Sequence, residues 1–212
     1  MQAQRDPSNA AHVLAAAFPS RLAGDVRRVL TAMPESVTAP TTPFEVEVRG
    51  ETVAIPSRVY NEEPNTECGR TLSETRRTIL HCLYSRHHDG RVRRRHLERI
   101  VASGEPWAVP FVVQLVGEHV LEIITSIAQG LPGLAEPGSA QRRLYGEFIA
   151  RNPGFFARTE RRVVSYWSCY HRREYGAFGT YPGCALLEAL RTAAGEQVGT
   201  RLPRNTPPPR VG

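Results

Sequence analysis

Residues 107–129 carry the strongest apolar pattern in the chain, and they constrain the fold more than any other stretch. Large apolar side chains cover most of the surface of a helix over these residues. Polar side chains share the one remaining strip, formed by Gln114, Glu118, Glu122, Thr125 and Gln129. These polar positions interrupt the stretch too often for a membrane-spanning helix. The pattern therefore predicts one long helix at the centre of a helical core.

A single region shows the alternation that is typical of strands. Phe44, Val46 and Val48 alternate with charged residues, Gly50 and Glu51 supply a turn, and the alternation resumes over 53–55. Helical periodicity accounts for the other patterned segments, namely 8–18, 20–33, 74–87, 91–102, 139–151, 156–175 and 182–194. The predicted fold is mainly α: an irregular helical bundle or a set of HEAT-like helical hairpins, with one small N-terminal β-hairpin.

Proline-rich and polar stretches divide the chain into four parts. We expect N-terminal helices over 1–33, a linker and the β-hairpin over 34–60, a helical core domain over 71–195, and a disordered tail over 196–212. The tail contains three consecutive prolines, Pro207 to Pro209, which favour disorder.

Composition describes a globular protein of modest positive charge. Of the 212 residues, 41% are apolar and 23% are charged, which allows a packed core, and the formal net charge is +6. All 27 cationic side chains are arginine. Arginine codons are frequent in GC-rich genomes, so this bias indicates a bacterial source such as an actinobacterium; the alternative is selection for bidentate recognition of phosphate or carboxylate.

The four cysteines, Cys68, Cys82, Cys169 and Cys184, form no Cys-x-x-Cys pair. This spacing indicates neither a zinc ribbon nor a redox motif. The apolar stretch 10–18 is short, has Asp6 ahead of it and leads into a charged helix, unlike a secretory signal. We therefore expect a cytoplasmic protein with reduced, buried cysteines and no membrane association.

Two helical patterns meet in a short turn at 88–90, and the second helix opens with Asp89-Gly90-Arg91-Val92-Arg93. This run is similar to the Asp-x-x-Val-Arg run that opens the second helix of a HEAT repeat, so residues 74–102 resemble a HEAT-like helical hairpin. The resemblance implies that Val92 packs inward and that Asp89 and Arg93 tie neighbouring repeats together by charge-assisted hydrogen bonds. His96 and Leu97 stand where the family usually has a small residue, and no second copy of the run recurs at a fixed period. Residues 83–113 also resemble segments of uncharacterised actinobacterial proteins, which implies no function.

The same helix is strongly basic. Arg91, Arg94, Arg95 and Arg99 fall close to one face by their spacing, and His88 precedes them. We interpret these five residues as the candidate partner-binding site, and the leading hypothesis is a protein–protein interaction or scaffold module that contacts an acidic protein surface. The alternative is a nucleic-acid-binding protein that uses the basic helix 91–102. A solvated face, with Glu118 and Glu122 as natural partners for these arginines, is the simplest structural interpretation.

Further motifs give weaker signals. Tyr166, Trp167 and Tyr170 form an aromatic-rich helix end flanked by arginines, which favours core packing, with base stacking as the alternative. The histidines at 81, 87, 88 and 96 fall at no familiar ligand spacing, so no metal is expected. No phosphate-binding loop, dinucleotide fingerprint or nucleophile elbow is present in the sequence, and no cofactor is expected. A catalytic site assembled from distant residues remains a separate hypothesis.

Overall fold

The computed structural model describes residues 7–65 and 71–207, with side chains from residue 10 onward. The described chain is mainly helical and contains one two-stranded antiparallel sheet, which confirms the predicted fold class. The chain divides into two compact units, Met1–Ile100 and Val101–Gly212. This boundary lies inside the predicted core domain over 71–195, because the helices before residue 100 belong to the same unit as the N-terminal helices and the hairpin.

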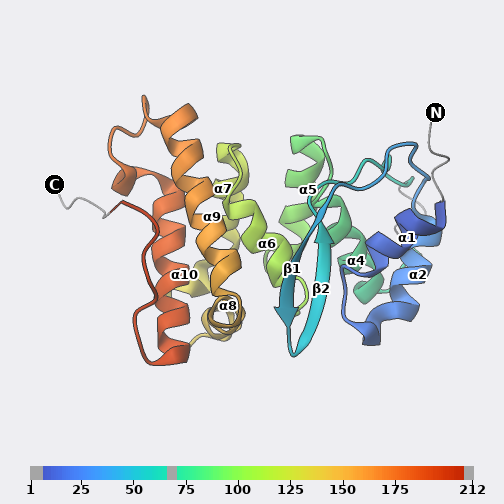
Figure 1. Cartoon of the computed structure of the whole chain (residues 1–212), viewed down its shortest axis with the longest axis horizontal. Helices are drawn as coiled ribbons and strands as arrows, with labels where there is room; N and C mark the ends of the chain where they lie inside the picture. Colours follow the sequence, from blue (N-terminus) through green and yellow to red (C-terminus); the bar gives the residue numbers. More distant parts are fainter. Residues whose placement is uncertain (1–6, 66–70, 208–212) are drawn as a thin grey trace. The chain divides into compact units, whose positions relative to one another are not determined.

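The first unit packs short helices against the hairpin. Ser73 caps α4 (Glu74–Tyr84), since its hydroxyl accepts a hydrogen bond from the backbone N–H of Arg76. Helix α4 packs against α2 (Ala23–Ala32) and α5 (Gly90–Ile100). The elements of this unit are α1 (Pro7–Ala15), η1 (Ser20–Leu22), α2 (Ala23–Ala32), β1 (Pro43–Val48), β2 (Glu51–Pro56), α4 (Glu74–Tyr84) and α5 (Gly90–Ile100) (Figure 1).

The hairpin turn lies one residue earlier than predicted. Its two central residues are Arg49 and Gly50, with φ of 51° and 89°, whereas Glu51 already belongs to β2 and pairs with Val48. Positive φ at both central positions is the twist that suits a two-residue hairpin. An isolated hairpin is marginal in water. Here a backbone hydrogen bond of 2.8 Å from Ala54 to Ala16 joins it to the end of α1.

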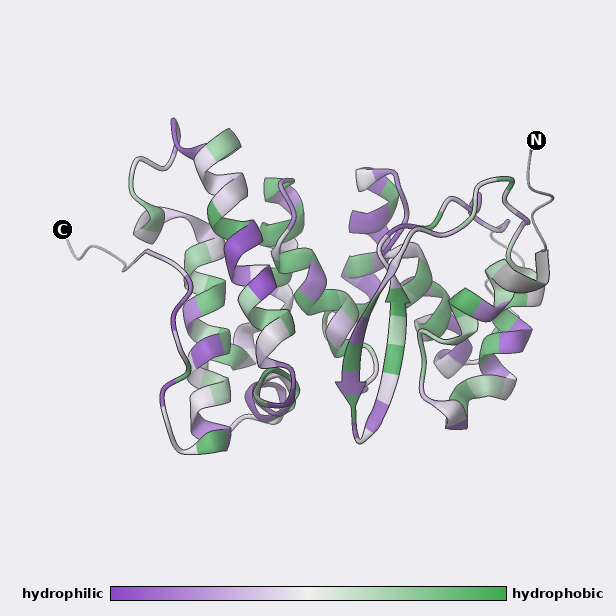
Figure 2. Ribbon diagram, in the orientation of Figure 1, coloured by the Kyte–Doolittle hydropathy of each residue, from purple (hydrophilic) through white to green (hydrophobic). Residues whose placement is uncertain are grey.

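The second unit is entirely helical in its described part. Hydrophobic residues cover most of α6 (Figure 2). Helix α8 packs closely on α10 at Gly146, where an added Cβ would lie 2.8 Å from the backbone carbonyl carbon of Ala193. The elements are α6 (Val109–Val116), α7 (Leu121–Gly130), η2 (Pro132–Ala135), α8 (Ala140–Arg151), α9 (Pro153–Tyr166), the π-helical turn η3 (Trp167–His171), η4 (Phe178–Thr180) and α10 (Pro182–Val198).

The prediction of one long helix over 107–129 is wrong. The helix ends at Val116, Gly117 adopts φ −86° and ψ 33°, and a new helix begins after Val120. Because Gly117 has no side chain, the side chain of Arg162 can pack against its backbone. A Cβ added to residue 117 would lie 3.3 Å from the Cβ of Arg162. Glu118 is buried, with its carboxylate 3.9 Å from the Arg162 guanidinium. The apolar pattern continues through the break because α6 and α7 both bury one face in the same core.

The C-terminal segment is structured further than predicted. Helix α10 continues to Val198, and Gly199 ends it with φ 70°, a left-handed conformation that suits glycine. Arg204 and Asn205 then form side-chain hydrogen bonds to the helices of the unit. The predicted disordered tail over 196–212 therefore differs from the structure over 196–207, and 208–212 lie outside the described residues. Over the described ranges, the helices are too short or too polar to cross a bilayer.

Candidate functional site

Three of the predicted arginines surround a hollow on the outer face of α5. Arg91, Arg94 and Arg95 line it together with Glu98, and its volume is about 350 Å³. All four residues are exposed, and their spacing of three and four places them on one stripe of the helix. We call this feature the arginine hollow. Guanidinium groups in this arrangement can donate paired hydrogen bonds to a carboxylate or a phosphate.

The turn before α5 fixes the direction of this stripe. The Asp89 carboxylate accepts a 2.7 Å hydrogen bond from the backbone N–H of Arg91, so it caps the helix. Arg93 is buried, and its Nη1 donates to the carbonyls of His87 and His88 at 2.9 Å each. Val92 is also buried. These hydrogen bonds of Asp89 and Arg93 stabilise the turn itself.

Carboxylates already contact two of the three arginines. Arg94 Nε donates to Glu98 Oε1 at 2.9 Å, and both side chains are about half exposed, with values of 48% and 46%. Arg95 forms an ion pair with Glu63, which comes from the loop after the hairpin. Exposed pairs of this kind contribute little to stability, and a competing anion can displace them.

A chain of hydrogen bonds through His96 and His81 holds Glu63 in place. Its Oε1 accepts from Nε2 of His96 at 2.8 Å, and Nδ1 of His96 lies 2.8 Å from Nδ1 of His81. The Glu63 carboxylate can only accept, so Nε2 of His96 carries the proton. In neutral His96 the other ring nitrogen, Nδ1, then accepts a hydrogen bond, and Nδ1 of His81 donates it. Tyr84 stacks on His96 at 5.0 Å and donates a 2.6 Å hydrogen bond to the carbonyl of Glu62. These contacts attach the acidic loop to α4 and α5.

The pKa values in this chain of contacts favour neutral histidines. Burial, followed by the electrostatic interactions with His96, Arg99 and Arg77, lowers the pKa of His81 to about 4. Burial also lowers the pKa of His96, against the opposing effect of Glu63. Burial alone would raise the pKa of Glu63, but its hydrogen bond from His96 and the charge of Arg95 lower it. The Glu63 carboxylate is therefore ionised at neutral pH and sits against Arg95.

Two predicted site residues lie outside the hollow. Arg99 is exposed but does not line it, and its charge acts on His81 instead. The imidazole of His88 stacks on Tyr60 with ring centroids 5.2 Å apart. Three other basic side chains of this stretch, His87, Arg93 and His96, are buried and lie outside the predicted basic face.

Sequence reasoning missed both carboxylates of the site. Glu98 follows Arg94 at the i, i+4 spacing that favours an ion pair on a helix, so the sequence held a signal for it. Glu63 is 32 positions from Arg95, and only the acidic pair Glu62-Glu63 in a polar loop marked it. Glu118, expected as a partner of the α5 arginines, is instead buried near Arg162 and His119.

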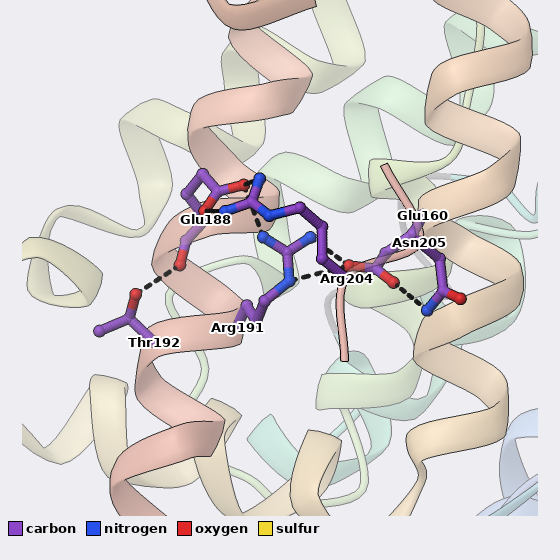
Figure 3. Close-up of polar contacts among 6 residues, drawn as sticks. All are labelled: Glu160, Glu188, Arg191, Thr192, Arg204 and Asn205. Atoms are coloured by element: carbon purple, nitrogen blue, oxygen red, sulfur yellow. Dashed lines mark hydrogen bonds and ion pairs between the residues drawn. The ribbon is translucent and has the colours of Figure 1, made fainter. Parts of the chain in front are cut away.

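The second unit contains a separate polar cluster between α9, α10 and the C-terminal segment (Figure 3). Glu160 is fully buried and accepts from Arg191 through Oε1 and from Asn205 through Oε2, the latter at 2.7 Å. Glu188 accepts from Arg191 and from Arg204 at 2.5 Å each. Since these carboxylates and guanidiniums satisfy one another, the cluster stabilises the packing of the C-terminal segment.

The metal-ligating side chains and the thiols form a further group of candidates. Within the part of the chain that the structure describes, no group of three or more His, Cys, Asp or Glu residues is arranged to hold a metal ion. Cys82 and Cys184 are free and buried as expected, but Cys169 is exposed, contrary to expectation. Cys68 lies outside the described residues. Burial raises the pKa of the Cys82 and Cys184 thiols, so both are poor nucleophiles.

No family model, curated protein or solved structure matches the chain. Its function is therefore inferred from the residues and geometry described above.

Proposed function

We propose that the protein is a protein–protein interaction or scaffold module whose arginine hollow binds an acidic segment of a partner protein. The observation that carries this proposal is the hollow of about 350 Å³ lined by Arg91, Arg94 and Arg95. The helical hairpin of α4 and α5, similar to a HEAT-like hairpin, supplies a rigid support. Its capped turn and buried Arg93 keep the stripe of arginines in one orientation.

Glu63 illustrates the ligand that suits the hollow. Its carboxylate contacts Arg95, and it reaches α5 from an acidic loop of the same chain. A partner carboxylate can contact Arg91 directly and can compete with Glu98 for Arg94. An acidic protein segment presents separated carboxylates on flexible side chains, which can fit between the two carboxylates already present.

A continuous phosphate backbone fits this face less well. Glu98 and Glu63 lie among the arginines, and a phosphate backbone with regularly spaced charges has less freedom than flexible glutamate side chains to avoid both carboxylates. The exposed face of α5 also has no Asn, Gln, Ser or Thr that could read base edges. These two features favour an acidic protein over nucleic acid as the ligand of α5.

The test is binding of a short fluorescein-labelled poly-glutamate peptide to the full chain and to Arg91→Glu. Arg91 lies in the first turn of α5, where an acidic side chain suits the helix dipole, so the substitution leaves the fold intact. We expect it to weaken peptide binding about tenfold or more, the equivalent of about 1.4 kcal/mol.

The matched control is Arg28→Glu, which changes the net charge equally at an exposed position of α2. It should leave the affinity within about twofold, because it reverses a charge away from the hollow, whereas one charge pair in the hollow is worth about 1 kcal/mol or more. Equal losses in both variants would indicate only net-charge attraction and would overturn the proposal. Tighter binding of duplex DNA than of the peptide, lost in Arg91→Glu, would replace it with the nucleic-acid alternative.

A further inference from the structure

Three aromatic rings gather on the outside of the second unit. The ring centroid of His119 lies 5.6 Å from that of Tyr166 and 5.7 Å from that of Tyr170, and the two tyrosine rings are 6.0 Å apart. Tyr170 is 65% exposed, and the side chain of His119 is 49% exposed. We call these three rings the aromatic face. Core packing, the interpretation that the sequence favoured for Tyr166, Trp167 and Tyr170, does not account for the exposed Tyr170.

The fold builds this face from two segments that are distant in the sequence. The break between α6 and α7 places His119 beside the end of α9, where His171 Nε2 donates a 2.8 Å hydrogen bond to the His119 carbonyl. The π-helical turn η3 carries Tyr170 outward, and π-helical turns are frequent at functional sites. The neighbouring Trp167 is anchored inward, since its Nε1 donates to the Tyr175 carbonyl at 2.8 Å and its ring packs on Phe178.

Arginines extend the aromatic face along α9. Arg158, Arg162, Tyr166 and Tyr170 are spaced four residues apart, so cations and rings share one row of the helix. Arg158 is exposed and Arg162 is partly exposed. Further exposed arginines flank the row, namely Arg161, Arg172 and Arg173. Carboxylates in the neighbouring segments include the buried Glu118, 3.9 Å from Arg162, and the exposed Glu122 and Glu174. Cations therefore outnumber carboxylates around the rings.

We propose that the aromatic face and its arginines bind single-stranded nucleic acid. Exposed rings offer π surfaces on which unpaired bases stack, and the arginine row supplies cations for the phosphates between them. A duplex hides its base faces, so it can use only the arginines. An acidic peptide likewise leaves Tyr170 and His119 without a stacking partner. This binding site lies in the second unit and is independent of the arginine hollow.

The experiment measures fluorescence anisotropy of labelled oligo-dT, oligo-U and a duplex of the same length with the full chain. We expect both single strands to bind at least about tenfold more tightly than the duplex. We expect Tyr170→Ala to weaken single-strand binding about tenfold, as loss of one base stack does. Tyr170→Phe keeps the ring and should bind like the original protein. DNA and RNA single strands share the chemistry that the site recognises, and the two oligonucleotides rank them.

Arginine variants test the phosphate contacts. Arg158→Ala should reduce the slope of log affinity against log salt concentration by about 0.7, the value for one phosphate contact on a single strand. The matched control is Arg201→Ala, an exposed arginine beyond the far end of α10. Helix α10 has 17 residues and is about 25 Å long; Arg201 follows its C-terminal end, whereas His171 of η3 stacks on Tyr181 at its N-terminal end. The Arg201→Ala substitution should leave both affinity and slope unchanged.

Four outcomes would overturn the proposal. Equal affinity for single strands and duplex would remove the role of the rings, as would equal affinities of Tyr170→Ala and Tyr170→Phe. Loss of oligonucleotide binding in Arg91→Glu, with Tyr170→Ala unaffected, would assign nucleic-acid binding to the arginine hollow. Tighter binding of poly-glutamate than of oligonucleotide, weakened by Arg158→Ala, would make the row a site for acidic protein.

Discussion

The imidazoles of His81 and His96 face each other with their Nδ1 atoms 2.8 Å apart. A hydrogen bond at this distance needs one donor and one acceptor, so it fails when both rings are doubly protonated. Arg99 and Arg77 act on His81, while Arg95 and Glu63 act on His96. The pair connects α4 to α5, and through Glu63 it connects both helices to the loop beside the arginine hollow.

The first unit is therefore expected to lose stability in mild acid. The pKa of His81 is about 4 in the folded protein and about 6.5 in an unfolded chain. Between these values the unfolded state binds more protons, so the free energy of unfolding falls as pH falls from about 6.5 towards about 4. The lowered pKa values of His96 and Glu63 act in the same direction. We expect a loss of about 2 kcal/mol between pH 7.5 and pH 4.5, reduced from the full shift by the partial exposure of His81.

This loss of stability can be measured by amide hydrogen exchange of peptides from α4 and α5, after correction for the pH dependence of the intrinsic exchange rates. His81→Asn keeps a donor near the position of Nδ1 but removes one titrating group, so its pH dependence should be shallower. His12→Asn, at an exposed position of α1, is the control and should follow the original protein. A His81→Asn profile with the original slope would contradict the prediction.

Arg93 contributes to the fold, whereas the neighbouring Arg94 contributes to the surface. Arg93→Met leaves the carbonyls of His87 and His88 without their shared donor, so we expect it to destabilise the first unit by about 2 kcal/mol. Arg94→Met removes an exposed pair with Glu98 and should cost less than about 0.5 kcal/mol. Thermal unfolding followed by circular dichroism compares the two. Equal shifts in melting temperature would show that the buried contacts of Arg93 carry no special weight.

Local sequence signals predicted the helices and the hairpin. Tertiary contacts determined where the central helix breaks and which charged side chains are buried. The alternation around Val46 and the periodicity of the helices depend on residues near each other in the chain, so the mainly α class with one hairpin followed from them. The break at Gly117 depends on Arg162, which lies far along the chain and fills the space beside that glycine. No periodicity reveals such a contact. For the same reason the stripe of arginines on α5 was predictable, but the burial of Arg93 and the approach of Glu63 were not.

Glu160 is expected to be the most sensitive carboxylate of the second unit. Its ion pair with Arg191 is nearly inaccessible to water, so Glu160→Gln removes the buried one of the two carboxylates that neutralise this guanidinium and leaves only Glu188. Breaking one side of such a pair costs about 3 kcal/mol. Glu188→Gln removes a carboxylate that is 31% exposed and should cost about 1 kcal/mol or less.

Tryptophan fluorescence during urea unfolding is the readout, because both tryptophans, Trp107 and Trp167, belong to the second unit. A larger loss in Glu188→Gln than in Glu160→Gln would invert the expected order. It would mean that the partly exposed pair of Glu188 with Arg204 is what attaches the C-terminal segment.

Gly146 permits a close contact between α8 and α10, and its substitution tests how rigid that contact is. A Cβ at this position would meet the carbonyl oxygen of Ala193 and lie 2.8 Å from its carbon, and a backbone group cannot rotate away as a side chain can. Gly146→Ala must push α8 from α10, so we expect a loss of about 1–3 kcal/mol despite the better helix propensity of alanine.

Gly154, near the start of α9, has its nearest neighbour 4.0 Å away, at the flexible end of Arg158. Gly154→Ala should be neutral or stabilise the unit by up to about 1 kcal/mol, since only propensity changes there. The same urea titration ranks the pair, and stabilisation by Gly146→Ala would mean that the two helices separate freely.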